Sequence, residues 1–366
     1  MAACTGPTSS GSFHGPDLVI AITPDATADT NPRTPIQVKV TGGTLSAATV
    51  TSPSGHGIDG AFANDKTSWS TTDVLGYGKT YQVSATAVGG NGEKLTKTAT
   101  LHTVTPKAQI YPSVIPNPGG TDIGVGQPLR VQFDHDVPDR ALAQKLLNVT
   151  SVPSQPGAWY WISDRIADYR PQGFWQAGSK ITLDIKDYGV DFGGGLYGQE
   201  DRTVTYSVHD SWVAYADGGT EQMVIKHNGE QVKTMPISMG KDETPTHAGT
   251  HVISHKDVNY TMNSCSYGVC GGPKAYVAVE HYAVRISNDG EFVHENPNSV
   301  GSQGNSNVSH GCINLNEENA VWFFNHFNAG DVVIVTNSGG QALPLDDLWG
   351  DWSIPWSKWS RGNADK

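Results

Sequence analysis

The sequence has little of what would place it on a nucleic acid or across a membrane. Its 366 residues carry a formal net charge of −12, lysine and arginine form no cluster, and no apolar run approaches a membrane span. Nucleic acids and anionic membranes attract basic patches, and a spanning helix needs roughly 18 or more consecutive apolar residues. We therefore expect neither a nucleic-acid partner nor a transmembrane helix.

Charged residues are also scarce, at 16% of the chain, whereas glycine occurs 42 times among many serines and threonines. Short runs alternate between apolar and polar residues and are separated by Gly, Pro, Asn and Asp, a pattern typical of strands joined by polar turns. The clearest runs are 36–40, 81–87, 129–133, 181–185 and 203–208. The pattern predicts a mostly β protein.

The same pattern divides the chain into five parts. Residues 1–16 form a polar tail that we expect to be disordered, and residues 17–105 and 106–208 each have the strand spacing of an immunoglobulin-like β-sandwich. Residues 209–337 form a third domain. Residues 338–366 contain four tryptophans within eleven positions, which is too much apolar surface to leave in water, so this extension is predicted to pack on another domain.

Two segments of the third domain have a recognisable character. Residues 259–280 contain Gly, Pro and Cys and are predicted to be a long irregular segment, of the kind that forms binding loops or lids. Asn316 is a good N-cap for a helix over residues 316–328, and two glutamates follow it at the positive end of the helix.

The chain has four cysteines, and each has its own interpretation. Cys4 follows Met-Ala-Ala and precedes a polar tail, as the lipid-bearing cysteine of a bacterial lipoprotein signal does; the alternative is a chance cysteine in a disordered tail. Cys265 and Cys270 either close a small turn through a disulfide or remain free thiols. Cys312 is the odd thiol and therefore the candidate for reactivity.

Three histidines, His247, His251 and His255, recur at every fourth position. In their Gly-, Thr- and Val-containing context we expect a strand with all three on one side. Because no acidic or cysteine ligand accompanies them in the sequence, we predict no metal site. Nothing else in the sequence indicates a cofactor.

Residues 291–316 combine one cysteine with two histidines in a loop rich in Gly, Ser and Asn. Cys312 becomes a strong nucleophile only as the thiolate, and either His294 or His310 is available as the base. Gly311 admits positive φ, so backbone N–H groups of this loop can turn inward and stabilise an oxyanion. The residues predict a thiol that transfers acyl groups, and the alternative is a buried, inert cysteine.

His294, followed after fourteen residues by Ser309-His310-Gly311-Cys312-Ile313-Asn314, resembles the signature of the L,D-transpeptidases, whose catalytic domain is of the YkuD type. Residues 238–242 (SMGKD) and 350–356 (GDWSIPW) are similar to the mycobacterial members. Those members carry two immunoglobulin-like domains before the catalytic domain and a tryptophan-rich extension after it. The resemblance covers nearly the whole chain beyond the tail.

The resemblance implies an enzyme of peptidoglycan biosynthesis, with a role in cell wall organisation and cell shape. Cys312 would attack the diaminopimelate carbonyl of a donor tetrapeptide stem, release D-Ala and form a thioester. The diaminopimelate amine of an acceptor stem would then resolve the thioester and give a 3→3 cross-link. Carbapenem β-lactams would acylate the same cysteine as covalent inhibitors.

The resemblance also implies a role for each residue of the loop. His294 would be the base, with its ring held by the backbone carbonyl of Glu295. Backbone N–H groups would bind the oxyanion, namely those of His310, Gly311 and Cys312. Asn314 would brace the loop and Ser309 would hydrogen-bond within it, and both would border the substrate.

Residues 259–280 match the lid over the active site in this family. Three side chains of the lid are candidates for the substrate wall: Met262, Tyr267 and Tyr276. Cys265 and Cys270 depart from the family pattern, and a disulfide there would stiffen the lid. The Glu295 carboxylate would raise the pKa of His294 if it turned inward.

Two alternatives to cross-linking stay open. Water in place of an amine would make the protein an L,D-carboxypeptidase, and a vestigial loop would make it a non-catalytic scaffold that binds the wall through its β-domains. All these functions belong to an exported protein at the outer face of the cytoplasmic membrane, in the periplasm or in the cell wall. Cys4 is the candidate lipid anchor and the one expected attachment to the membrane.

Overall fold

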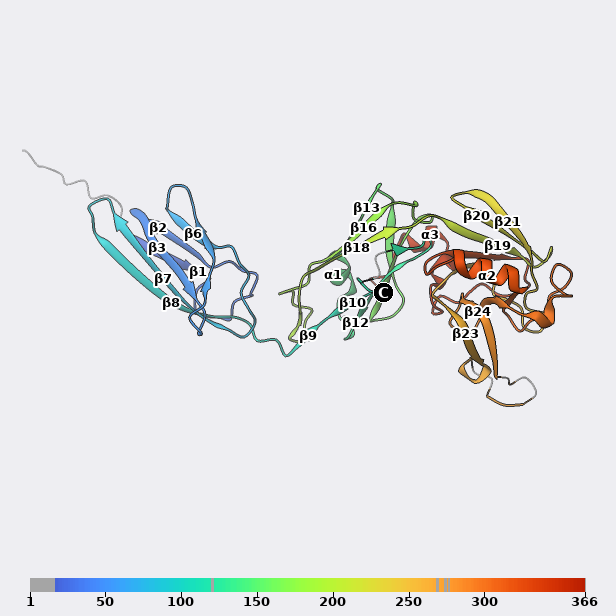
Figure 1. Cartoon of the computed structure of the whole chain (residues 1–366). Coiled ribbons are helices and arrows are strands. Elements are labelled where there is room, and N and C mark those ends of the chain that lie inside the picture. The colour runs from blue at the N-terminus through green and yellow to red at the C-terminus, as the bar shows by residue number, and fades with distance from the viewer. Residues whose placement is uncertain (1–16, 120–121, 268–269, 273–274, 276, 366) are drawn as a thin grey trace, which may run out of the picture. The chain divides into compact units, whose positions relative to one another are not determined.

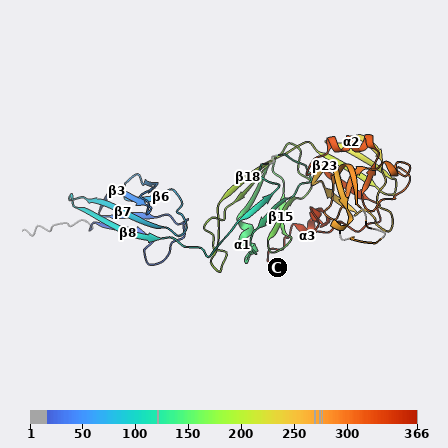
Figure 2. The same cartoon turned by 60° about the horizontal axis from the view of Figure 1, so that its bottom comes forward.

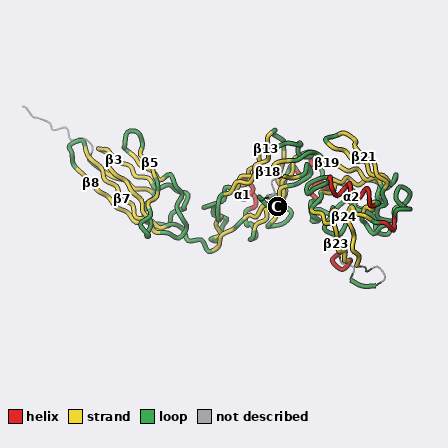
Figure 3. Tube along the Cα trace, in the orientation of Figure 1, coloured by secondary structure: helices red, strands yellow, loops and turns green. Residues whose placement is uncertain are grey.

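The computed structural model describes residues 17–119, 122–267, 270–272, 275 and 277–365. Strands make up most of the ordered elements and the helices are few and short (Figure 3), as the composition predicts. The chain splits into two compact units, Met1–Gln109 with Tyr188–Gln199, and Ile110–Asp187 with Glu200–Lys366 (Figure 1). Cys4 and Tyr276 lie outside the described residues.

Two four-stranded sheets form a β-sandwich in the first unit. In β7, Tyr81, Val83, Ala85 and Ala87 are buried and alternate with more exposed residues, as a strand with one face on a core requires. Strands β3, β7 and β8 lie side by side in both views (Figures 1 and 2). The sheets are, in spatial order, β1 (Val19–Thr23), β2 (Gln37–Thr41), β6 (Ser68–Thr71) and β5 (Gly60–Phe62), and β4 (Gly57–Ile58), β3 (Gly43–Thr51), β7 (Thr80–Gly89) and β8 (Lys94–His102).

A second sandwich opens the other unit. Its buried core includes Val131, Leu183 and Tyr206, each of which lies in a central strand of one of the two sheets. One sheet holds β10 (Pro112–Ile115), β12 (Leu129–Phe133), β15 (Ile166–Pro171) and β14 (Gly157–Trp161); the other holds β11 (Asp122–Ile123), β18 (Arg202–Val208), β16 (Lys180–Ile185) and β13 (Leu147–Val152). Helix α1 (Arg140–Lys145) precedes β13. β17 (Leu196–Gly198), which belongs to the first unit, pairs with β9 (Ala108–Ile110) in a two-stranded sheet.

The remainder of the second unit contains two further sheets that share one core with helix α2 (Glu317–His326). Asn316 caps this helix by accepting a hydrogen bond from the Asn319 N–H at 2.9 Å, which confirms the predicted helix start. Buried Phe323 and Phe327 join the core. The sheets are β21 (Glu230–Pro236), β20 (Gln222–His227), β19 (Trp212–Asp217), β27 (Val332–Thr336) and β22 (Gly249–Val252), and β23 (His255–Asn263), β24 (Val277–Arg285), β25 (Phe292–Glu295) and β26 (Ile313–Leu315). The predicted fold class, two sandwiches followed by a β-rich domain with one main helix, is confirmed.

Two local predictions in this region are wrong. Residues 259–280 are not one irregular segment, because β23 and β24 pair from His255↔Arg285 to Asn263↔Val277 and form a long hairpin (Figure 1). The histidines do not share a strand either. His247 precedes β22, His251 lies in β22 and His255 begins β23.

The tryptophan-rich extension contains η3 (Gly350–Ser353) and α3 (Trp356–Trp359) and packs against the second sandwich. Trp359 is fully buried, stacks on Tyr160 with ring centroids 5.0 Å apart, and donates its indole N–H to the Ala158 carbonyl at 2.8 Å. Among the described residues, no helix is long and apolar enough to cross a membrane.

Candidate active site

Neighbouring strands bring Cys312 and His294 together. β25 and β26 pair in parallel with Val293 opposite Ile313 and His294 opposite Asn314, so Cys312, which directly precedes β26, lies against the strand that carries His294. Cys312 is the free cysteine among the described residues and is partly buried. His294 is buried, with 3% of its surface exposed. The register places one thiol and one imidazole in a largely dry environment.

The Nδ1 atom of His294 is held by two oxygens. It lies 2.7 Å from the backbone carbonyl of Glu295, the contact that the resemblance implied, and 3.1 Å from Oε2 of Glu280. The carboxylate at the imidazole therefore belongs to Glu280, and the suggestion that the Glu295 side chain plays this part was wrong. Occupation of Nδ1 leaves Nε2 as the ring nitrogen for the sulfur.

Two neighbouring groups raise the pKa of His294. Burial alone would lower the pKa of the imidazole, but hydrogen bonds with Cys312 and Glu280, together with their charges, raise the pKa of His294 to about 10. At neutral pH the ring is therefore protonated. A protonated imidazole next to a sulfur favours the thiolate, so the pair suits a nucleophilic cysteine.

A tight turn precedes Cys312 and is closed by side chains. The Ser309 hydroxyl donates to the Cys312 carbonyl at 2.6 Å and accepts from the Gly311 N–H at 3.1 Å. Gly311 has φ +132°, a conformation that residues with a Cβ rarely adopt, and its carbonyl accepts from the buried Thr246 hydroxyl at 2.7 Å. The Gly311 N–H is thus engaged within the turn, although the resemblance gave it to the oxyanion.

Residues of the SMGKD segment run alongside this turn. Ser238 and Asn314 exchange two backbone hydrogen bonds, at 3.2 and 2.9 Å, and the Ser309 N–H donates to the Met239 carbonyl at 3.0 Å. This pairing braces the loop, and it is made by the backbone of Asn314. The Asn314 side chain is buried, and its Oδ1 has no hydrogen-bond partner within the described part of the chain.

A cavity of about 390 Å³ opens beside the sulfur. Six of the residues singled out in the sequence border it: Met262, His294, Ser309, His310, Cys312 and Asn314. Glu280 and Ala275 border it from the β23–β24 hairpin, and Asn296 and Ser299 from the loop after β25. The side chain of Tyr267 lies outside the described part, as does Tyr276.

The lid cysteines are joined in the structure. Cys265, in the short helix η1 (Ser264–Tyr267), forms a disulfide with Cys270, five residues later, at the tip of the hairpin. Glu280 is the residue of the site that sequence reasoning missed. It follows the apolar residues Val277, Ala278 and Val279 in β24, and only the pairing of β24 with β23 and β25 brings it to His294.

Comparison with known proteins decides the family. Residues 27–191 match the model of a bacterial Ig domain, and residues 211–335 match that of the L,D-transpeptidase catalytic domain. L,D-transpeptidase 2 of Mycobacterium tuberculosis strain CDC 1551 is 38% identical over 95% of this chain and 85% of its own length. The chain belongs to the L,D-transpeptidase family. L,D-transpeptidase 5 of strain H37Rv is 34% identical over 92% of this chain and 74% of its own.

Solved structures of L,D-transpeptidases share the fold. The structure of LD transpeptidase LdtMt1 in complex with imipenem matches with a TM-score of 0.55 and 30% identity, covering 63% of this chain and 100% of that chain. L,D-transpeptidase 3 from Mycobacterium tuberculosis, in complex with a faropenem-derived adduct, matches with a TM-score of 0.52 and 29% identity, covering 61% and 97%. The resemblance drawn from the motif is confirmed.

Proposed function

We propose that this protein is a peptidoglycan L,D-transpeptidase with Cys312 as its nucleophile. The observation that carries the proposal is the placement of Cys312 beside the buried His294 at the edge of a cavity, in a chain of this family. Its substrates are peptidoglycan stem peptides. Its place of action is outside the cytoplasmic membrane, at the cell wall.

In the first half-reaction, the Cys312 thiolate attacks the diaminopimelate carbonyl carbon of a donor tetrapeptide and a C–S bond forms. Protonated His294 gives its proton to the departing amine, the C–N bond breaks, and D-Ala leaves. In the second, neutral His294 takes a proton from the diaminopimelate amine of an acceptor stem as that amine attacks the thioester. The C–S bond breaks, a 3→3 cross-link forms, and the thiolate–imidazolium pair is restored.

Backbone N–H groups of the turn before Cys312 stabilise the tetrahedral oxyanion. Those of His310 and Cys312 are the donors we favour, because the Gly311 N–H already serves Ser309. Glu280 and the Glu295 carbonyl keep the imidazole in position through both half-reactions. Met262, on the hairpin, borders the cavity and forms part of the proposed wall around the substrate. The roles of Tyr267 and Tyr276 in that wall stay predictions from the family.

Acylation by a carbapenem tests the nucleophile directly. Because family structures hold imipenem or a faropenem-derived adduct, intact-mass spectrometry should show wild-type protein gaining the mass of one imipenem. Cys312→Ala should gain none, whereas Cys4→Ser, which keeps the catalytic thiol, should be acylated like wild type. An equal adduct on Cys312→Ala would contradict the assignment.

A disaccharide-tetrapeptide substrate tests the reaction. Wild-type protein should yield cross-linked dimers with loss of D-Ala, and Cys312→Ala should yield none. Tripeptide in place of dimer would identify an L,D-carboxypeptidase, in which water resolves the thioester. Absence of both products and of the carbapenem adduct would leave the wall-binding scaffold, and radiolabelled lipid incorporation lost in Cys4→Ala would establish the lipid anchor.

A further inference from the structure

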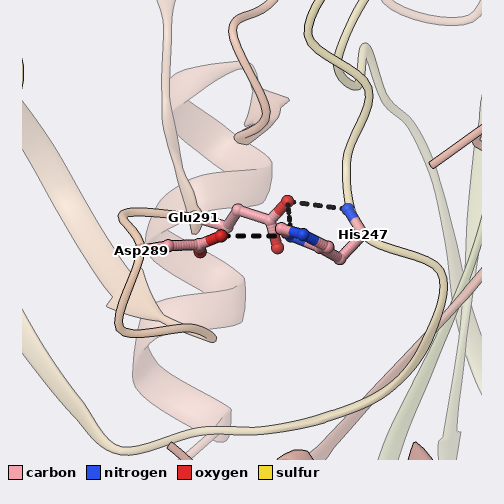
Figure 4. Close-up of side chains that lie close together, drawn as sticks. All are labelled: His247, Asp289 and Glu291. Atoms are coloured by element: carbon pink, nitrogen blue, oxygen red, sulfur yellow. Dashed lines mark hydrogen bonds and ion pairs between the residues drawn. The ribbon is translucent and has the colours of Figure 1, made fainter. Parts of the chain in front are cut away.

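Three side chains from two distant parts of the sequence, His247, Asp289 and Glu291, lie close together (Figure 4). His247 Nδ1 lies 3.0 Å from Oε1 of Glu291 and 3.3 Å from Oδ2 of Asp289, and one ligand atom of each residue lies within 4.8 Å of the other two. This cluster is not apparent in the sequence, because the two carboxylates follow His247 by more than forty residues. The fold brings these two acidic side chains to His247.

The spacing of the three atoms fits a small divalent cation. In tetrahedral zinc sites the bonds to nitrogen and oxygen are about 2.0–2.2 Å, which places neighbouring ligand atoms about 3.3 Å apart. The two distances from His247 Nδ1 agree with that value. The nitrogen donor favours zinc over magnesium or calcium, which prefer ligand sets made of oxygen alone.

The charge and burial of Glu291 point to a ligand as well. Its side chain is 7% exposed, and its Oε2 has no hydrogen-bond partner within the described residues. His251 Nδ1 is 3.7 Å from that oxygen, which is too far for a hydrogen bond. A buried carboxylate oxygen without a partner is costly, and a cation at this point would remove the cost.

The turn that carries the two carboxylates is fixed in place. Asp347 accepts hydrogen bonds from the N–H groups of Asn288 and Asp289, at 2.7 and 3.1 Å, and adds a third negative charge near His247. On the other side, the Arg285 guanidinium donates to the carbonyls of Ser287 and Asn288 at 2.8 and 2.7 Å. The ligands are thus held before any cation arrives.

The same turn touches the nucleophile. The Gly290 carbonyl, between the two carboxylate residues, lies 3.6 Å from the Cys312 sulfur. A methyl group on Gly311 would come 3.6 Å from Glu291 Cγ. Whatever binds at the carboxylates therefore sits next to the catalytic turn.

We propose that His247, Asp289 and Glu291 form a binding site for a zinc-class divalent cation, with solvent completing the coordination on the side of the partly exposed Asp289. The site is distinct from the Cys312–His294 pair and does not depend on the transpeptidase activity. Its cation would hold the 289–291 turn against the catalytic loop.

Calorimetric titration with zinc tests the proposal, on EDTA-treated protein that carries Cys4→Ser and Cys312→Ser so that no free thiol competes. We expect one equivalent to bind and the melting temperature to rise with zinc concentration. Asp289→Asn and His247→Ala should each weaken binding by at least the roughly 10- to 100-fold that loss of an outer-shell partner costs. His227→Ala is the matched control, because His227 pairs with Asp210 at 3.2 Å outside this cluster and should leave binding unchanged.

Crystals soaked in zinc should show one anomalous peak bounded by the three side chains. Asp289 is 43% exposed at its side chain, so Asp289→Asn should fold normally, as far-UV circular dichroism can check. Three outcomes would each overturn the proposal. They are failure of the Cys4→Ser, Cys312→Ser protein to bind zinc, binding that is unaltered by Asp289→Asn, and an anomalous peak elsewhere.

Discussion

Two acceptors share the Nδ1 proton of His294, and they do different work. The Glu295 carbonyl at 2.7 Å is neutral and fixes the orientation of the ring, whereas Glu280 at 3.1 Å brings a charge. An anion favours the protonated imidazole, so Glu280 raises the pKa of His294. In the mechanism we propose, the carboxylate would thereby help His294 to protonate the leaving amine.

Glu280→Gln should shift the pH dependence of acylation. Because the carboxylate raises the pKa of His294, its removal should lower that pKa from about 10, and the alkaline fall of the imipenem acylation rate should move down by about one pH unit or more. The measurement is the second-order acylation rate between pH 6 and pH 11, the window that spans about 6.5, the ordinary histidine value, and the raised one. Asp257→Asn is the control, because Asp257 is a carboxylate of the same hairpin that pairs with His255, at 3.8 Å, and not with His294. An unmoved alkaline limb in Glu280→Gln would show that Glu280 does not set the charge of His294.

Sequence reasoning reached the residues of the site that a short motif holds together. Cys312 and His310 are neighbours in one loop, and His294 has a fixed spacing from them. Glu280 and the pair of Asp289 and Glu291 with His247 became visible only through strand pairing, because side chains far apart in sequence leave no local pattern. The sequence therefore indicated the residues that the motif keeps together, and it did not indicate the residues that other strands bring to them.

At the scale of elements, the β23–β24 hairpin explains another miss. In β24 the alternation of apolar and polar residues that marks a half-buried strand is weak, because Val277, Ala278 and Val279 are followed by two polar residues. The Gly-, Pro- and Cys-containing tip suggested a loop. The sandwich strands were predictable because one face of each lies on a core. The hairpin is stabilised by its own pairing, and it carries Met262 and Glu280 to the cavity.

The disulfide at the hairpin tip should contribute both to stability and to ligand binding. It closes a short loop, so we expect Cys265→Ser/Cys270→Ser to lower the free energy of unfolding by less than the roughly 3 kcal/mol of a 15-residue loop. A freed tip must lose backbone freedom when a ligand binds; ordering the equivalent of one residue costs about 1 kcal/mol, so imipenem affinity should weaken about fivefold.

Stopped-flow acylation over a range of imipenem concentrations separates affinity from the limiting rate, and the limiting rate should be unchanged. Ser266→Ala lies between the two cysteines, keeps the disulfide and serves as control. A fall in the limiting rate with unchanged affinity would indicate that the hairpin acts on the chemical step instead.

At the scale of the whole molecule, the extension ties parts of the second unit together. Near its start, Asp347 holds the turn at Asn288 and Asp289 close to Cys312, and near its end Trp359 is buried against β14 of the second sandwich. Arg170, which is 2% exposed, lies 4.6 Å from the rings of both Trp352 and Trp359 and donates to the Ile354 carbonyl at 2.7 Å. The large apolar surface of the four tryptophans made this packing predictable from the sequence. The burial of Arg170 beneath them was not predictable.

Trp359→Ala should therefore destabilise the second unit well beyond the site of the change. Loss of a fully buried indole, its stack on Tyr160 and its hydrogen bond to Ala158 should lower the free energy of unfolding by about 3–5 kcal/mol. Differential scanning calorimetry should show the catalytic domain and the second sandwich, which share this packing, melting at lower temperature. Lys358→Ala, at an exposed neighbouring position, should change the free energy of unfolding by no more than about 0.5 kcal/mol. A loss below about 1 kcal/mol in Trp359→Ala would mean that the extension is attached to the sandwich without stabilising it. The hydrogen bonds of Asp347 to the turn at Asn288 and Asp289 would then not depend on the tryptophans.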